Sequence, residues 1–230
     1  MEQLIFELAR PEPPTFANFV AGRNGEAIQT LRAIAAGANT ETGVVLWGAV
    51  GGGKSHLVQA AVAAARRAGR ATQRYERAAD VEDRAPEAGA LIAIDDVDAA
   101  DATSQGRIFT LYNALAATRG QLVVASAAAP GGLSLRDDLR TRLSHGLVFE
   151  IVPLADAEKA AAIGHYAHER GFSLSSDVIG YLLAHGRRDM ASLVATLSAL
   201  DRHSMSTKRA ITIPLLRDWL QRNHGAGSNH

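Results

Sequence analysis

The segment that most constrains this chain is Gly48-Ala49-Val50-Gly51-Gly52-Gly53-Lys54-Ser55. It has the spacing of a phosphate-binding loop, and it stands between an apolar stretch at 44–47 and a helical pattern at 55–68. Its glycines let successive backbone N–H groups point at phosphate oxygens, and the helix adds the positive end of its dipole. The chain has lysine only at positions 54, 159 and 208, so a chance match at this spacing is improbable. The loop therefore predicts a nucleotide site in a strand-loop-helix unit.

Each polar residue of the loop has an expected role toward ADP or ATP. Lys54 is expected to reach the β and γ phosphates, and Ser55 to ligate Mg²⁺. The loop residues and the first residues of the helix are expected to hold the nucleotide, namely Gly48, Gly51, Gly52, Gly53, Lys54, Ser55 and His56.

A second motif supports the first. The apolar stretch 91–94 ends in Asp95 and Asp96, about forty residues after the loop. Asp95 is expected to hold Mg²⁺ through water, and Asp96 to polarise the attacking water. Two carboxylates after a strand can also merely start a turn, but the loop upstream favours the metal-nucleotide role.

Composition narrows the class of protein. Of 230 residues, 47% are hydrophobic and 21% charged, enough for one large domain or two small ones. No apolar run has the length of a membrane span, and the start resembles no signal peptide. With no cysteine, the chain suits a reducing cytosol, so a cytoplasmic location is expected and no membrane partner. Lys and Arg balance Asp and Glu at 24 each, which gives no general attraction to nucleic acid.

The order of apolar patterns predicts an α/β fold followed by helices. Five short strands are expected at 44–47, 71–75, 91–95, 121–126 and 147–151, alternating with helices at 24–36, 55–68, 105–118 and 135–144. Such alternation predicts a five-stranded parallel sheet covered on both faces. Helices alone follow Pro153, at 156–170, 176–185, 189–203 and 214–222. The expected organisation is an extended tail at 1–14, a nucleotide-binding core at 15–153, a helical lid at 154–222 and a disordered tail at 223–230.

The two motifs, the helical lid and the segment Thr15-Phe16-Ala17-Asn18-Phe19-Val20-Ala21-Gly22 together resemble the DnaA branch of the AAA+ ATPases. The helical segment 109–115 resembles the helix that follows the acidic pair in these proteins, and the resemblance extends over about residues 15–222. It implies an AAA+ P-loop core in which Phe19 and Val20 lie near the adenine. No basic recognition helix of the kind found in DnaA follows Arg222, so contact with DNA is expected only through a partner.

The resemblance also assigns two arginines. Arg142 matches the arginine finger, which projects toward the nucleotide of a neighbouring subunit, and Arg188 matches the lid arginine that senses the protein's own nucleotide. The alternative for each is a solvated arginine at a helix end. A finger of this kind acts on a neighbouring AAA+ subunit. The resemblance implies that this subunit belongs to DnaA, and a homo-oligomer is the alternative.

One segment departs from the family pattern. After the fourth strand, DnaA has an acidic or amide residue followed by arginine where this chain has Ala127 and Ala128. A group that orients the hydrolytic water is therefore missing, and Ser126 replaces it only in part. The departure predicts weak intrinsic ATP hydrolysis.

The N-terminal segment Gln3-Leu4-Ile5-Phe6-Glu7-Leu8 resembles the peptide by which replication proteins dock on the sliding clamp. In that mode Gln3 binds a polar pocket, while Leu4, Phe6 and Leu8 occupy apolar grooves. The alternative is an edge strand that covers the protein's own core, which prolines at 11, 13 and 14 disfavour.

Taken together, the resemblances imply a negative regulator of replication initiation. Such a protein binds the DNA-loaded clamp, the beta subunit of DNA polymerase III, and stimulates ATP hydrolysis by DnaA. Two alternatives remain open at this point: a self-contained AAA+ ATPase or loader related to DnaA, and an adaptor that binds DnaA without the clamp.

Overall fold

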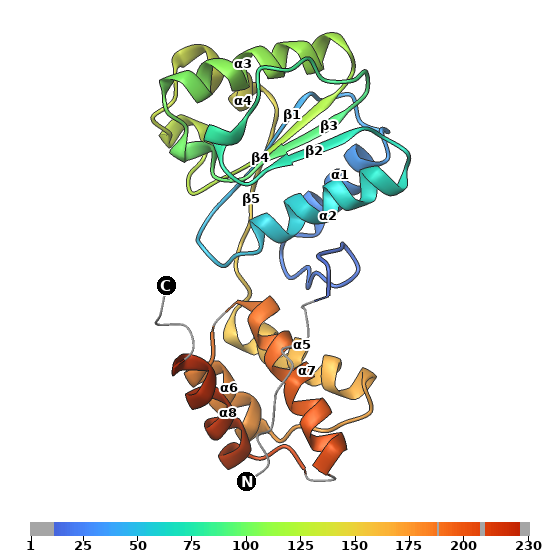
Figure 1. Cartoon of the computed structure of the whole chain (residues 1–230), viewed down its shortest axis with the longest axis vertical. Helices are drawn as coiled ribbons and strands as arrows, with labels where there is room; N and C mark the ends of the chain where they lie inside the picture. The colour runs from blue at the N-terminus through green and yellow to red at the C-terminus, as the bar shows by residue number, and fades with distance from the viewer. Residues whose placement is uncertain (1–11, 188, 208–209, 226–230) are drawn as a thin grey trace. The chain divides into compact units, whose positions relative to one another are not determined.

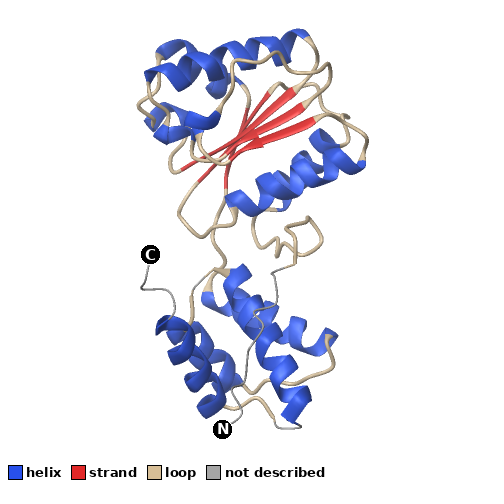
Figure 2. Cartoon of the chain, in the orientation of Figure 1, coloured by secondary structure: helices blue, strands red, loops and turns tan. Residues whose placement is uncertain are grey.

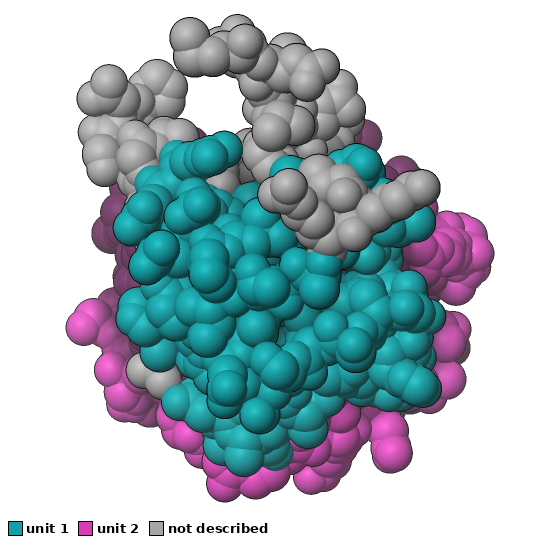
Figure 3. All heavy atoms as spheres, turned by 90° about the horizontal axis from the view of Figure 1, so that it is seen from below, with its two compact units in different colours: residues 1–13, 154–230 teal, residues 14–153 magenta. Residues whose placement is uncertain are grey.

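The computed structural model describes residues 12–187, 189–207 and 210–225. Contacts divide the chain into two compact units, which are coloured separately in Figure 3. One unit runs from Pro14 to Pro153, and the other contains Leu154 onward together with Glu12 and Pro13.

The first unit is built on a parallel sheet of five strands, β1 (Gly43–Trp47), β2 (Thr72–Tyr75), β3 (Leu91–Ile94), β4 (Gln121–Ser126) and β5 (Leu147–Glu150). Their order across the sheet is β2-β3-β4-β1-β5. All four pairings are parallel, so every strand ends at the same edge, and β1 lies between β4 and β5. The end of β1 is therefore flanked by the ends of two strands that come much later in the sequence.

Helices cover both faces of this sheet (Figures 1 and 2). Alternate residues of β1 point to opposite faces: Val45 packs toward α3 (Ala102–Ala117) and α4 (Asp137–His145), while Val44 and Leu46 pack toward the other pair of helices. That pair is α1 (Gly25–Ala35) and α2 (Lys54–Arg67). Three short 3₁₀ turns complete the unit at Ala78–Asp80, Val97–Ala99 and Pro130–Gly132.

The predicted fold class is confirmed: a parallel five-stranded P-loop core precedes a small all-helical unit. Strand ends differ from the predicted ones by a single residue at most. The largest difference in the core is at α3, which begins at Ala102 rather than 105, because the Asp101 side chain accepts a hydrogen bond from the Ser104 N–H and caps the helix earlier.

The second unit contains α5 (Asp156–Glu169), α6 (Ser176–His185), α7 (Met190–Thr207) and α8 (Ile213–Gly225). They enclose an apolar cluster of their own, in which Leu182, Leu197 and Leu216 are fully buried. α7 and α8 extend beyond their predicted ends at 203 and 222. α8 thus enters the segment 223–230 that was expected to be disordered, and residues 226–230 lie outside the described part of the chain. None of the described helices is both long and apolar enough to cross a lipid bilayer.

Candidate functional site

The phosphate-binding loop follows β1 at the edge where all the strands end. Its backbone depends on glycine: Gly48 has a φ of +139°, and a Cβ there would stand 2.6 Å from the carbonyl oxygen of Ile151. Gly53 has a φ of +98° and directly precedes α2. The loop thus packs against the exit of β5, a contact that follows from the sheet order.

Lys54 lies within the curve of the loop. Its ammonium group donates hydrogen bonds to the carbonyl oxygens of Gly48 (2.7 Å) and Ala49 (3.0 Å). Burial lowers the pKa of Lys54, whereas the carboxylates of Asp98, Asp96 and Asp95 act in the opposite direction. A bound phosphate would offer this cation stronger acceptors than the two carbonyls.

Asp95 lies directly after β3 and is buried. Its Oδ2 accepts a hydrogen bond from Nη1 of Arg74 at 3.0 Å, while its buried Oδ1 has no hydrogen-bond partner among the described residues. Burial raises the pKa of Asp95. The Ser55 hydroxyl, which faces it without making a hydrogen bond of good geometry, and Arg74 lower that pKa.

The donor set around Asp95 fits Mg²⁺. A carboxylate oxygen without a partner and a serine hydroxyl beside it are the hard oxygen ligands that this ion prefers, and the phosphate loop is adjacent. The two residues predicted as metal ligands, Ser55 and Asp95, are therefore brought together.

Two further carboxylates follow Asp95. Asp96 is exposed and has a left-handed backbone, with a φ of 58°, so the chain turns sharply after the strand. Asp98 accepts a hydrogen bond from the Ala127 N–H at 3.3 Å, which ties the loop after β3 to the loop after β4. Sequence reasoning did not single out Asp98, although a third carboxylate two residues beyond the acidic pair was a visible signal.

Ser126 is the last residue of β4 and directly precedes Ala127 and Ala128, the two alanines at which the chain differs from the DnaA pattern. It is buried, and its hydroxyl donates to the carbonyl oxygen of Ala128 at 2.7 Å. Its proton is thus engaged by its own loop, so Ser126 has no free donor to offer a hydrolytic water in this arrangement.

The segment before α1 packs on the phosphate-binding loop. A Cβ on Gly53 would lie 2.6 Å from the ring of Phe19, and that ring is 5.3 Å from the His56 ring. His56 Nε2 donates to the carbonyl oxygen of Thr15 at 2.9 Å, and burial lowers the pKa of His56. Phe19 and His56 thus lie beside the phosphate-binding loop, and Val20, next to Phe19 in the chain, is 36% exposed.

Asn24 connects the segment before α1 to Val152, near the last residue of the sheet unit in the sequence. Its side chain donates to the carbonyl oxygen of Val152 (3.0 Å) and accepts from the Val152 N–H (2.8 Å). It is buried and makes no cap for α1. Nothing in the sequence near either residue indicates this pair, which joins positions 128 residues apart.

Arg142 lies near the side of the sheet where the strands begin, whereas the phosphate-binding loop lies at the side where they end. It belongs to the last turn of α4, just before β5, whose first residue Leu147 pairs with Val44 near the start of β1. The loop begins at the other end of β1, about 13 Å away along the strand. Arg142 is therefore remote from the phosphate loop of its own chain.

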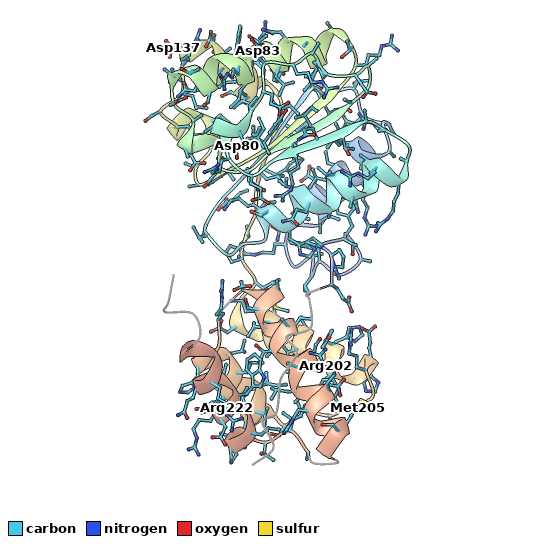
Figure 4. The ribbon with its side chains drawn as sticks, viewed as in Figure 1. Asp80, Asp83, Asp137, Arg202, Met205 and Arg222 are labelled. Carbon is cyan, nitrogen blue, oxygen red and sulfur yellow. The ribbon has the colours of Figure 1, made fainter. Side chains whose placement is uncertain are left out.

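The charge of Arg142 is also unneutralised. Arg136 pairs with Asp138 at 2.7 Å, and Arg140 pairs with Asp137, which stands at the start of α4 (Figure 4). Arg142 is exposed and makes no hydrogen bond or ion pair with any described residue. It lies close enough to the buried Tyr112 to lower that phenol's pKa, against the larger effect of burial, which raises it.

Five predicted site residues lie outside the described part of the chain. They are the lid residue Arg188 and the four tail residues Gln3, Leu4, Phe6 and Leu8.

Known proteins resemble both units of the chain. Residues 156–220 match the family model described as Hda, lid domain. Domain III of the replication initiation protein DnaA from Thermotoga maritima superimposes with a TM-score of 0.73 at 20% identity, covering 91% of this chain and 95% of that one. AMPPCP-bound DnaA from Aquifex aeolicus gives 0.67 at 24% identity over 82% of this chain and 64% of that one.

The same fold is found in a further solved structure. A mutant of RuvB from Thermotoga maritima gives a TM-score of 0.64 at 16% identity, over 91% of this chain and 72% of that one. At such identities the solved structures show the shared fold. Together with the match of residues 156–220 to the Hda lid model, they show that the chain has the fold of DnaA domain III followed by a helical unit that is similar to the Hda lid.

Proposed function

We propose that this Hda-like relative of DnaA is a negative regulator of replication initiation that stimulates ATP hydrolysis by DnaA through Arg142. The observation that carries the proposal is an exposed, unpaired arginine at the sheet edge away from its own phosphate loop. From this position Arg142 does not reach a nucleotide at the phosphate loop of its own chain. Its exposed guanidinium can contact a nucleotide that a neighbouring subunit holds.

The chemistry proposed for Arg142 is electrostatic. A guanidinium presents five donors in a plane and stays charged, so it stabilises the negative charge that develops on a departing γ-phosphate. Fingers supplied in this way accelerate hydrolysis by about 10³ to 10⁵ in other NTPases. In this proposal the ATP belongs to DnaA, and Arg142 enters its site from outside.

The protein's own site holds ADP or ATP and sets a conformation. Lys54 binds the phosphates, and Ser55 with Asp95 holds Mg²⁺, which neutralises phosphate charge when it is bound. Phe19, Val20 and the lid residue Arg188 are proposed to contact the same nucleotide. Asp96 is the residue proposed to polarise water, but Ala127, Ala128 and the engaged hydroxyl of Ser126 leave it without help, which supports weak intrinsic hydrolysis.

The sliding clamp is proposed as the second partner, through Gln3, Leu4, Phe6 and Leu8. A tail that docks on a DNA-loaded clamp would bring Arg142 close to DnaA without any DNA contact of its own. Deleting residues 1–8 separates this role from that of an adaptor independent of the clamp, since only the adaptor would keep its activity.

The central experiment follows ATP hydrolysis by ATP-bound DnaA in the presence of DNA-loaded clamp and this protein. Arg142→Ala is expected to lose the stimulation, a fall of at least about 100-fold. Arg140→Ala is the matched control, because Arg140 lies on the same helix but is paired with Asp137. If the Arg142 variant stimulates as well as wild type, the finger assignment is wrong.

A self-contained AAA+ ATPase or loader is the second candidate, favoured by the completeness of the phosphate loop and acidic pair. It predicts substantial hydrolysis by the protein alone, abolished by Lys54→Ala and independent of Gln3. Hydrolysis measured without DnaA distinguishes the two candidates.

A further inference from the structure

The acidic residue of the candidate metal site already has a cationic partner. Arg74, on β2, donates through Nη1 to Oδ2 of Asp95 at 3.0 Å and through Nη2 to Oε1 of Glu76 at 2.6 Å. Arg74 and Asp95 are largely shielded, with side chains 26% and 12% exposed, whereas Glu76 is 74% exposed. The Arg74–Asp95 pair is thus the inner half of a bridge that extends to the surface.

The strand register explains how Arg74 reaches Asp95. Arg74 stands opposite Ala93 on β3, and Asp95 is two residues further along, on the same face. Ala93 has only a methyl group, so the longer side chain of Arg74 can pass over it toward the strand end. This is the face that α2 covers, and Ser55 lies at the start of α2.

We propose that Arg74 is a positioning residue that occupies the carboxylate of the metal site and weakens Mg²⁺ binding, so that nucleotide is held with little dependence on the metal. The proposal rests on the nucleotide site put forward above and adds a residue to it. The observation behind it is that Arg74 bonds one oxygen of Asp95, while the other oxygen has no hydrogen-bond partner among the described residues and faces Ser55.

The physical reason is competition between cations. A guanidinium hydrogen-bonded to a shielded carboxylate cancels much of the charge that would attract a dication, and it repels the dication as well. Glu76 holds the second arm of the guanidinium, so Arg74 does not leave easily. A purely structural ion pair would affect folding but would not discriminate between nucleotide with and without metal.

The test measures the affinity of fluorescently labelled ADP by anisotropy, in Mg²⁺ and in EDTA. Wild type is expected to show a small ratio between the two affinities. Arg74→Gln is expected to raise that ratio about tenfold, because Mg²⁺ then meets an unshared carboxylate. Arg74→Lys keeps a positive charge, so its ratio should stay close to that of wild type. Arg74→Met keeps the apolar stem but no charge, and its ratio should rise as in Arg74→Gln.

Two controls sharpen the result. Arg77→Gln removes an exposed arginine that pairs with Asp80, labelled in Figure 4, and should leave the ratio unchanged. In an Asp95→Asn background, Arg74→Gln should have no further effect on the ratio.

An unchanged or smaller ratio in folded Arg74→Gln and Arg74→Met overturns the proposal for Arg74 alone. If wild type binds no nucleotide in either condition, the proposed nucleotide site fails and this proposal with it.

Discussion

Residues around the phosphate loop show how burial changes the chemistry of single groups. Lys54 and His56 are both partly buried, and burial lowers the pKa of each. Lys54 is surrounded by three carboxylates that oppose the shift, whereas His56 is opposed only by its hydrogen bond to the Thr15 carbonyl. The three carboxylates therefore offset part of the effect of burial on Lys54, whereas the lowered pKa of His56 favours its neutral form.

The lowered pKa of His56 predicts a pH dependence of stability. In the unfolded chain His56 titrates near its ordinary value of 6.5, and in the folded chain it titrates below that value. As pH falls through 6.5, the unfolded state takes up the proton first, so the free energy of unfolding decreases; above 6.5 the full stability is present. Urea unfolding at about pH 7.5 and about pH 5.5 should show a larger loss in wild type than in His56→Gln, whose amide keeps a donor for Thr15. Equal losses in the two proteins would rule out this role for His56.

At the scale of elements, a cluster at the amino edge of the sheet joins three segments. Arg70 donates to the carbonyl oxygens of Ile34 and Gly89 and to the side chain of Gln121, at the start of β4. Gln121 in turn donates to the carbonyl oxygen of Asn39 at 3.0 Å. One side chain after α2 therefore holds the end of α1, the loop before β3 and the first residue of β4.

Arg70→Met is expected to destabilise the core without weakening nucleotide binding. The variant keeps the apolar stem but leaves buried acceptors unpaired, which costs about 2–4 kcal/mol in the free energy of unfolding. Because the cluster lies at the edge opposite the phosphate loop, the nucleotide affinity of the folded fraction should stay within about twofold. Denaturant unfolding and labelled-ADP binding measure the two effects, and a large loss of affinity in the folded variant would contradict this division of the sheet into two edges.

Element boundaries also show where local patterns suffice. β4 and α6 occupy the predicted ranges. The apolar residues 122–125 of β4 are bounded by Gln121 and Ser126, and α6 is an amphipathic helix with a Ser175 cap, so each element contains its own end signals. The start of α3 was predicted wrongly at 105, although the capping residue Asp101 is a local signal that lies in the sequence itself. Arg70, in contrast, lies in a turn whose partners are 19 to 51 residues away, so no local pattern indicated its role.

At the scale of the molecule, the chain has two units with separate apolar clusters. The sheet unit has one cluster on each face, and the helical unit has its own around Leu182, Leu197 and Leu216. Exposed apolar side chains are few among the described residues, and Met205 on α7, at 74%, is one of them (Figure 4). Because each unit has its own apolar core, we expect each to unfold in its own cooperative transition.

Leu197→Ala tests that independence. Leu197 is fully buried in the helical unit, and its truncation should cost about 2–5 kcal/mol there. Calorimetry is expected to show a lower melting temperature for the helical unit and an unchanged transition for the sheet unit. Leu46→Ala in β1 is the reciprocal control, with the effects reversed. A single transition that shifts as a whole in both variants would show that the two units unfold together.

The sequence by itself determined the fold class, the position of the phosphate loop, the acidic pair and the helical character of the second unit. These features depend on backbone preferences of glycine and on apolar periodicity, which act over a few residues. Tertiary structure decided the rest: the Arg74–Asp95 pair, the Asn24–Val152 pair, the engaged hydroxyl of Ser126 and the edge on which Arg142 stands. The two pairs and the place of Arg142 depend on strand order and register, which bring distant residues together. The Ser126 bond depends on the path of the loop after β4. No local pattern contains that information.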